Sequence, residues 1–171
     1  MRESKFIIGI DADVHRVAYA ALDRGAVRAV GTIERTDYRG RIIEDYDARL
    51  MALMRRAKNV GAVVYLEGIY LAVRTGPGSK RNVDSFRKLS EVAGEIKRAA
   101  RQFGVKLDTV QPSTWQSKVL PGVRGRDDLK QAAIALAQEK WRRPLSSHES
   151  DAVCVAIHGF ESGKAKHSKA W

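Results

Sequence analysis

Short runs of apolar and β-branched residues alternate with polar turn residues over the first part of the chain. The apolar runs cover residues 6–12, 16–22 and 26–33, and residues 13–15 and 23–25 separate them. Links this short, carrying Asp, His or Gly, are typical of turns between neighbouring strands. The pattern therefore predicts three sequential strands, paired as an antiparallel meander.

Apolar residues then recur every three to four positions, which is the periodicity of an amphipathic helix. The residues that carry this first helical pattern are Ile42 or Ile43, Tyr46, Leu50, Leu53 or Met54, and Ala57. A near-continuous apolar run over 61–66 predicts a strand buried on both faces of a sheet. The same helical period from 83 to 103 predicts a longer helix, which Gly104 ends. Residues 105–110 follow as a fifth strand that Pro112 stops.

Two further helices are predicted in the last third of the chain. The first runs from near residue 126 to 141, and Pro144 lies beyond its end. The last begins at Ser146 or Ser147. There Ser146 and Glu149 fit a capping box, in which each side chain accepts a hydrogen bond from a backbone N–H of the other residue.

The order of these elements predicts a single α/β domain with a mixed sheet, which suits a length of 171 residues. We place this domain at 1–162 and expect 163–171 to form a short, mobile basic tail. Residues 71–82 and 113–128 show no helical or strand period and contain glycines and cations, so we expect irregular loops. Such loops contact phosphate backbones in some proteins and simply lie in solvent in others.

The chain is strongly basic. It has 31 Lys and Arg residues against 20 acidic ones, a net charge of +11 and a pI near 10. This balance favours a polyanionic partner, nucleic acid above all. The alternatives are a generic basic protein or one that meets an anionic membrane surface. We expect neither a membrane span, since no apolar run approaches about 18 residues, nor a secretion signal.

Cys154 is the one cysteine of the chain, so an internal disulfide and a Cys-rich zinc site are excluded. It lies within a run of Ala and Val, where a buried structural thiol is expected rather than a reactive one. A reducing cytoplasm is compatible with this usage.

Acidic residues stand at three points where a strand ends or a helix begins. Asp11 follows the first apolar run, Glu67 follows the fourth strand and is itself followed by glycine, and His148 and Asp151 lie one turn apart in the last helix. A single aspartate at a strand end is often a turn cap. If the first and fourth strands are neighbours, however, Asp11 and Glu67 meet. Clustered carboxylates repel one another, and divalent cations are the usual remedy. The sequence therefore predicts a metal-dependent enzyme that acts on nucleic acid.

These motifs, in this order, resemble a known family. GID near the start, LEG after the fourth strand and HxxD in the last helix are similar to the RuvC group of Holliday-junction resolvases, within the RNase H-like nuclease superfamily. Residues 82–85 before the long helix and the run DAVCVAIHG near the end fit as well. The resemblance implies an RNase H-like α/β fold, with a five-stranded mixed sheet flanked by helices. It also implies a cytoplasmic protein of a bacterial cell or of a phage-infected host.

The resemblance also implies the chemistry of the site. Asp11, Glu67 and Asp151 match the family's metal-binding carboxylates, and His148 matches a fourth position that is Asp in some members and His in others. Two Mg²⁺ ions about 3.5–4 Å apart would activate water and stabilise the departing 3′-oxygen, leaving 5′-phosphate ends. His148 is a poorer Mg²⁺ ligand than a carboxylate. It could instead orient the water or transfer a proton, and it would also suit Mn²⁺.

Further positions carry weaker expectations. Lys130 resembles the family's basic residue near the scissile phosphate. Asp13 could join the metal shell, although a turn role is favoured. Tyr70 could stack on an unpaired base or pack in the core. Glu149 is expected to be a capping carboxylate. The basic residues expected to contact DNA are Arg74, Lys80, Arg81, Lys118, Arg124 and Arg126.

The resemblance predicts a Mg²⁺-dependent, structure-selective endonuclease that resolves four-way DNA junctions by symmetric paired nicks. We expect a homodimer with helix 83–103 at its interface, because a two-fold pair presents two equivalent sites. One alternative is a related nuclease that acts on RNA–DNA hybrids or branched replication forks. A non-catalytic junction-binding module is another, and the intact acidic set argues against it because acids repel DNA.

Overall fold

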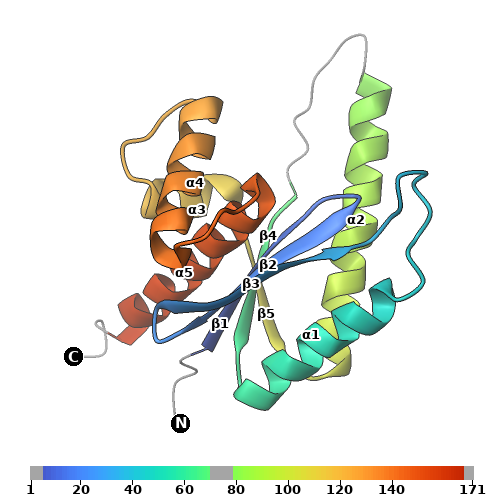
Figure 1. The fold of residues 1–171 in the computed structure, drawn as a ribbon, viewed down its shortest axis with the longest axis horizontal. Coiled ribbons are helices and arrows are strands. Elements are labelled where there is room, and N and C mark those ends of the chain that lie inside the picture. Colours follow the sequence, from blue (N-terminus) through green and yellow to red (C-terminus); the bar gives the residue numbers. More distant parts are fainter. Residues whose placement is uncertain (1–5, 70–78, 168–171) are drawn as a thin grey trace.

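A mixed sheet of five strands, with helices on both faces, organises the molecule (Figure 1). The computed structural model describes residues 6–69 and 79–167, apart from the side chains of 79–82 and 164–167. The strands are β1 (Phe6–Ala12), β2 (Arg16–Asp23), β3 (Ala26–Glu34), β4 (Val63–Glu67) and β5 (Lys106–Val110). The helices are α1 (Tyr46–Val60), α2 (Ser79–Gln102), α3 (Pro112–Val119), α4 (Arg126–Trp141) and α5 (Ser147–His167).

The strand order β3-β2-β1-β4-β5 confirms the predicted mixed sheet. The first three strands form the antiparallel meander expected from their short links. β4 then pairs in parallel with β1, and β5 pairs in parallel with β4. Helices must cross the sheet between parallel strands, and α1 and α2 make these two crossings. The ends of β1 and β4 therefore lie side by side at one edge of the sheet.

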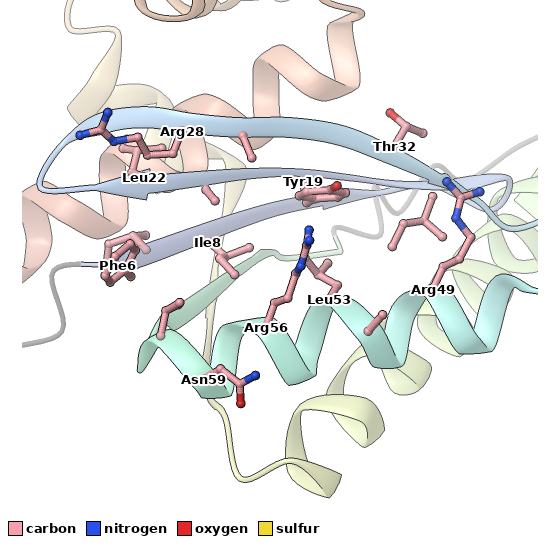
Figure 2. Close-up of a pocket in the computed structure, with 16 residues that line it drawn as sticks. Phe6, Ile8, Tyr19, Leu22, Arg28, Thr32, Arg49, Leu53, Arg56 and Asn59 are labelled. Atoms are coloured by element: carbon pink, nitrogen blue, oxygen red, sulfur yellow. The ribbon is translucent and has the colours of Figure 1, made fainter.

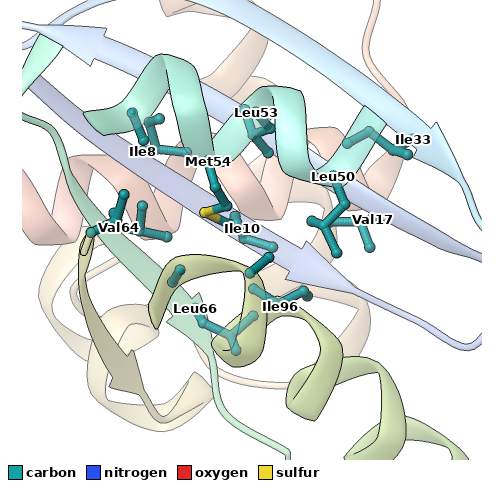
Figure 3. Packing of buried hydrophobic residues seen from close by; sticks show 14 of the residues in the cluster. Ile8, Ile10, Val17, Ile33, Leu50, Leu53, Met54, Val64, Leu66 and Ile96 are labelled. Carbon is teal, nitrogen blue, oxygen red and sulfur yellow. The ribbon is translucent and has the colours of Figure 1, made fainter. Parts of the chain in front are cut away.

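The alternation of side chains along β1 and β4 sends one set to each face of the sheet. Ile8 and Ile10 of β1, with Val64 and Leu66 of β4, pack under α1 and α2 (Figure 3). The buried residues that meet them from those helices include Leu50, Leu53, Met54, Val92 and Ile96. The positions between them, among them Asp11 and Glu67, belong to the opposite face, which α5 covers.

α5 approaches β1 so closely that one strand position must lack a side chain. A Cβ atom added at Gly9 would lie 2.2 Å from the carbonyl oxygen of Ala152 and 2.4 Å from the backbone nitrogen of Ala156. Ala and Val residues of α5 pack on β1 and β2, and α3 and α4 cover the outer side of α5 around Trp115 and the buried Cys154. The thiol is therefore a core group, as expected.

Four expectations about element boundaries are wrong. α2 begins at Ser79, within the stretch 71–82 that we expected to be an irregular loop, and not at Val83. α1 begins at Tyr46, because Ile42 is exposed and pairs with Thr36 in an isolated bridge instead of entering the helix. Residues 112–119 form α3 where we expected an irregular loop; Pro112 starts this helix, since proline at the first helical position loses no hydrogen bond. α5 continues to His167, beyond the expected tail boundary at Gly163.

A groove of about 460 Å³ opens between α1 and the strands β1, β2 and β3 (Figure 2). Its lining is mainly apolar and includes Phe6, Ile8 and Tyr19, with Arg49 and Arg56 of α1 at its side. It lies along the amino-terminal half of β1, so neither Asp11 nor Glu67 lines it. Among the helices of the described ranges, none is long and apolar enough to cross a membrane.

The contact at Gly9 generates a stability prediction. We expect Gly9→Ala to lower the free energy of unfolding by about 3 kcal/mol or more, because the new methyl group meets backbone atoms that can yield only by moving α5. Urea unfolding followed by circular dichroism would measure the change. Gly94→Ala is the matched control: this exposed glycine of α2 has open space around it, so its replacement should be neutral or stabilising by up to about 1 kcal/mol.

Candidate active site

Asp11 and Glu67 lie next to each other at the carboxyl ends of two parallel strands. The register pairs Ile10 with Leu66, so the next residue of each strand carries one of these acids on the face toward α5. The Asp11 side chain is only 9% exposed, and Glu67 is half-buried. The two carboxyl groups thus share one site, as the sequence predicted from the strand ends. Water reaches this site only partly, because Glu67 is less exposed than its place at a strand end suggests.

The start of α5 brings the other two predicted residues to this edge. The capping box is present: the Ser146 N–H donates to Glu149 Oε2 over 2.9 Å, and the Glu149 N–H donates to Ser146 Oγ over 3.2 Å. This pair fixes where the helix begins and confirms the capping role of Glu149. His148 and Asp151, which share a helix face, consequently point toward the strand ends.

His148 bridges two acids. Its Nδ1 lies 2.6 Å from Asp11 Oδ2, and its Nε2 lies 3.1 Å from Asp13 Oδ2. Hydrogen bonds to Asp11 and then to Asp13 outweigh the burial of the ring and raise the pKa of His148 from 6.5 to about 10. The imidazole is therefore protonated on both nitrogens at neutral pH, and each N–H donates to a carboxylate.

Asp13 has the turn role that we favoured, and it also supports His148. Its Oδ1 accepts the backbone N–H groups of His15 and Arg16 over 2.6 and 2.8 Å, which closes the turn between β1 and β2. Burial alone would raise the pKa of Asp13, but the bonds from His148, His15 and Arg16 lower it to about 2. Asp13 is thus a fixed anion that orients the histidine.

Glu67 and Asp151 have the opposite electrostatic character. Burial, together with the neighbouring Asp11, raises the pKa of Glu67 from 4.5 to about 9. Burial and Asp11 also raise the pKa of Asp151 from 3.8 to about 7, although the charges of His148 and Lys130 act against this rise. The acids therefore cannot all be ionised at neutral pH without added positive charge.

Trp115 is a site residue whose role sequence reasoning missed. It is 1% exposed, and its Nε1–H donates to Glu67 Oε1 over 2.7 Å. This bond favours the ionised carboxylate and fixes its direction. A signal was present in the sequence: a tryptophan five residues after the last strand, β5, which is the neighbour of β4. It was hidden because residues 113–128 did not show the period of a helix.

The carboxylate oxygens of this site are ligands of the kind that a hard divalent cation prefers. Asp11, Glu67 and Asp151 supply the carboxylate oxygens that Mg²⁺ prefers, and the raised pKa values of two of them are what a nearby cation would relieve. Among the described residues, no three His, Cys, Asp or Glu side chains are arranged so that they could hold one ion.

The predicted basic residues lie on several elements. Lys130 is exposed on α4, near enough to Asp151 to lower its pKa. Lys118 of α3 donates to Ser162 Oγ over 2.9 Å. Arg124, just before α4, and Arg126, its first residue, are both exposed. The remaining four predicted residues give no test: Lys80 and Arg81 fall in the first turn of α2 with side chains that are not described, and Tyr70 and Arg74 lie outside the described residues.

These pKa values give the site a pH signature in EDTA. Between pH 4.5 and about 9 the folded protein keeps a proton on Glu67 that the unfolded chain has released, so raising the pH favours unfolding. The raised pKa of Asp151 acts in the same direction between pH 3.8 and about 7. The raised pKa of His148 does so between pH 6.5 and about 10. We expect Glu67→Gln to flatten the fall in stability between pH 5 and 9, by at most about 1.4 kcal/mol per pH unit.

Chemical denaturation at several pH values in EDTA would check this expectation. Glu139→Gln is the matched control, because Glu139 is an exposed acid at the far end of α4 and should leave the pH profile unchanged. A wild-type protein whose stability rises between pH 5 and 9 would contradict the assignment of the buried protons.

Comparisons with known proteins bear on the fold. No family model and no curated protein matches the sequence. Two solved structures of RuvC from Thermus thermophilus do match in three dimensions, both at 14% identity. RuvC alone gives a TM-score of 0.64 over 95% of this chain and 96% of that one, and RuvC in complex with a Holliday junction substrate gives 0.67 over 95% of each. The chain therefore has the RuvC-like, RNase H-like fold that the motifs predicted.

Proposed function

We propose that this protein is a metal-dependent endonuclease that resolves four-way DNA junctions by paired nicks. One observation carries the proposal: Asp11 and Glu67 at the ends of two parallel strands meet His148 and Asp151 at the start of α5. The fold that holds them is shared with a protein solved in complex with a Holliday junction substrate. The strongly basic chain supports a DNA substrate.

Asp11, Glu67 and Asp151 would hold Mg²⁺, and the bound ions would activate water and stabilise the departing 3′-oxygen of the cut strand. Trp115 keeps the Glu67 carboxyl group directed into the site through its hydrogen bond. Asp13 holds the imidazole of His148 from the side remote from Asp11. His148, which lies beside Asp11 and Asp13, would orient the attacking water or transfer a proton to an oxygen of the substrate.

Positive charge beside the acids would receive the phosphate backbone. Lys130 acts on Asp151 through its charge, and its exposed ammonium group would contact a phosphate bound at the site. Arg126 is exposed at the start of the same helix, Arg124 is exposed just before it, and Lys118 is exposed on α3. Contacts of this kind position a strand without reading its bases, which suits an enzyme selective for structure.

Paired nicks require two equivalent sites, which a two-fold homodimer supplies. We propose α2 as the interface helix. It is the longest helix of the described chain, and its outward residues include Val83, a large apolar side chain that is 57% exposed. A monomeric active enzyme in sedimentation analysis with junction DNA would exclude this part of the proposal.

Asp11→Asn is the sharpest test of the catalytic assignment. Loss of a residue that only supports a metal ligand typically lowers metal affinity or activity by about 10–100-fold. Loss of Asp11, a proposed ligand itself, should therefore slow cleavage by about 100-fold or more. Binding should remain within about twofold, because the substitution removes an acid rather than a cation from a DNA-binding face. Cleavage of a labelled junction in Mg²⁺ and binding in EDTA would measure the two effects.

Asp47→Asn removes the same charge from an exposed position on α1 and should cut at the wild-type rate. Cleavage by Asp11→Asn at that rate would remove Asp11 from the mechanism. A panel containing an immobile junction, a mobile junction, a duplex, a fork and an RNA–DNA hybrid would separate the substrate classes. Symmetric nicks on junctions alone support the proposal, and preferential cutting of the hybrid would instead favour the RNA-directed alternative.

Cation binding can be tested without turnover. We expect Mg²⁺ at about 100 times its dissociation constant to stabilise the wild-type protein by about 2.7 kcal/mol, because the ion binds the folded site and not the unfolded chain. Thermal unfolding at rising Mg²⁺ concentration would show this as an increase in Tm. The increase should largely disappear in Asp11→Asn and persist in Asp47→Asn. Equal shifts in all three proteins would place the bound cation elsewhere.

A further inference from the structure

The loop between β3 and α1 displays large apolar side chains to solvent. Tyr38 is 87% exposed and Ile42 is 60% exposed. In the part of the chain that the structure describes, only two other large apolar residues are exposed, Val60 at the end of α1 and Val83 on α2. Two of the four thus stand within five positions of one loop.

The loop is built to hold its shape. The Asp37 carboxylate accepts the backbone N–H groups of Arg39 and Arg41 over 2.8 and 2.9 Å, and the Arg41 side chain donates to it over 2.9 Å. The Asp37 N–H donates to the Arg41 carbonyl over 2.8 Å, and Gly40 adopts a φ of +77° that closes the turn. Tyr38 therefore projects from a preorganised turn, which lowers the entropic cost of binding.

The chemistry at the tip suits a nucleobase. The guanidinium of Arg39 lies over the ring of Tyr38, 5.1 Å from its centre, so a planar cation and an aromatic ring are presented together. Aromatic rings and arginine are the groups on which single-stranded bases stack. Arg39 and Arg41 outnumber Asp37, so the tip also has the net positive charge that attracts a phosphate backbone.

The base of this loop is joined to the candidate active site. The Thr36 hydroxyl lies 2.7 Å from His15 Nδ1, and the Arg35 and Thr36 N–H groups both donate to the His15 carbonyl. His15 belongs to the turn that Asp13 closes, and Asp13 bonds His148. Tyr38 is thus two residues from a side chain that contacts the acid-bearing turn.

A buried ion pair fixes both ends of the loop to α2. Arg35 is 7% exposed and donates two hydrogen bonds to Glu95, from Nη2 over 2.8 Å and from Nε over 3.0 Å. Its Nη1 donates to the Val14 carbonyl over 3.2 Å. The Tyr46 hydroxyl donates to the same Glu95 over 2.9 Å. A bidentate pair of this kind holds direction as well as distance. Figure 1 shows the loop (cyan) reaching beyond the sheet on the side of α2.

From this arrangement we infer that Tyr38, with Arg39, stacks on an unpaired or unstacked base close to the strand that is cut. The inference rests on the proposed function, which supplies the nucleic acid, and it assigns a contact residue within that substrate. Tyr38 would hold the strand in register with the acids, because its loop and the His148-bonding Asp13 are fastened to the same turn.

The test uses a four-way junction with the fluorescent base 2-aminopurine at single positions from the branch point outward, in EDTA so that no strand is cut. We expect the wild-type protein to quench the fluorescence at one or two neighbouring positions. Tyr38→Ala should remove this quenching and weaken junction binding by about fivefold or more, which is the lower end of the loss of one stacked base. Tyr38→Phe and Tyr38→Trp should keep both signals, because each retains an aromatic face.

Val60→Ala is the matched control: it trims another exposed apolar side chain and should bind as wild type. Tm should be unchanged in every variant, because Tyr38 is 87% exposed. Equal affinity of Tyr38→Ala and wild type overturns the inference, and so does a loss in Tyr38→Phe as large as in Tyr38→Ala, since the hydroxyl would then be the contact.

Failure of the proposed function gives a different result. The wild-type protein would then show no preference for the junction over a duplex, a single strand or a hybrid. The Tyr38 series would be repeated on the nucleic acid that it binds best, and a loss confined to Tyr38→Ala there still supports stacking. A wild-type protein that binds no nucleic acid overturns both proposals.

Discussion

The contact between α5 and β1 at Gly9 is the constraint on which the rest of the structure depends. The helix lies so close to the strand that a Cβ atom at position 9 would overlap the backbone of Ala152 and Ala156. Only glycine, whose side chain is a hydrogen atom, fits at this position. The close approach buries the Ala and Val residues of α5 against the sheet and leaves its first turn beside the strand ends. The core and the acidic site are therefore set by the same packing contact.

The electrostatics of the site follow from that geometry. Alternation along β1 and β4 sends Asp11 and Glu67 to the face that α5 covers, so both are withdrawn from water together with Asp151. The crowding raises the pKa values of Glu67 and Asp151, and hydrogen bonds to Asp11 and Asp13 raise that of His148. The pKa of Asp13 is lowered, so this carboxylate stays ionised. Holding these acids together in a half-buried site lowers the stability of the fold. Such a loss is expected at residues that a fold keeps for chemistry and not for packing.

Much of this could be predicted from the sequence because period and spacing are local signals. The meander, the long helices and the meeting of Asp11, Glu67, His148 and Asp151 followed from apolar periods and from acids at element ends. The loop at 36–42 was misjudged because Ile42 matches the helical period by chance, and its exposure depends on tertiary contacts such as Arg35 with Glu95. The bond from Trp115 to Glu67 was missed because a helix of eight residues has too few turns to reveal a period.

The distance along the chain between the two halves of the site has a consequence for synthesis. Asp11 belongs to the first strand to be made, whereas its partner His148 follows 137 residues later. A ribosome-bound chain exposes β1 with its acid for most of its elongation while the helix that completes the centre does not yet exist. No shortened product that stops before α5 would hold the full set of acids.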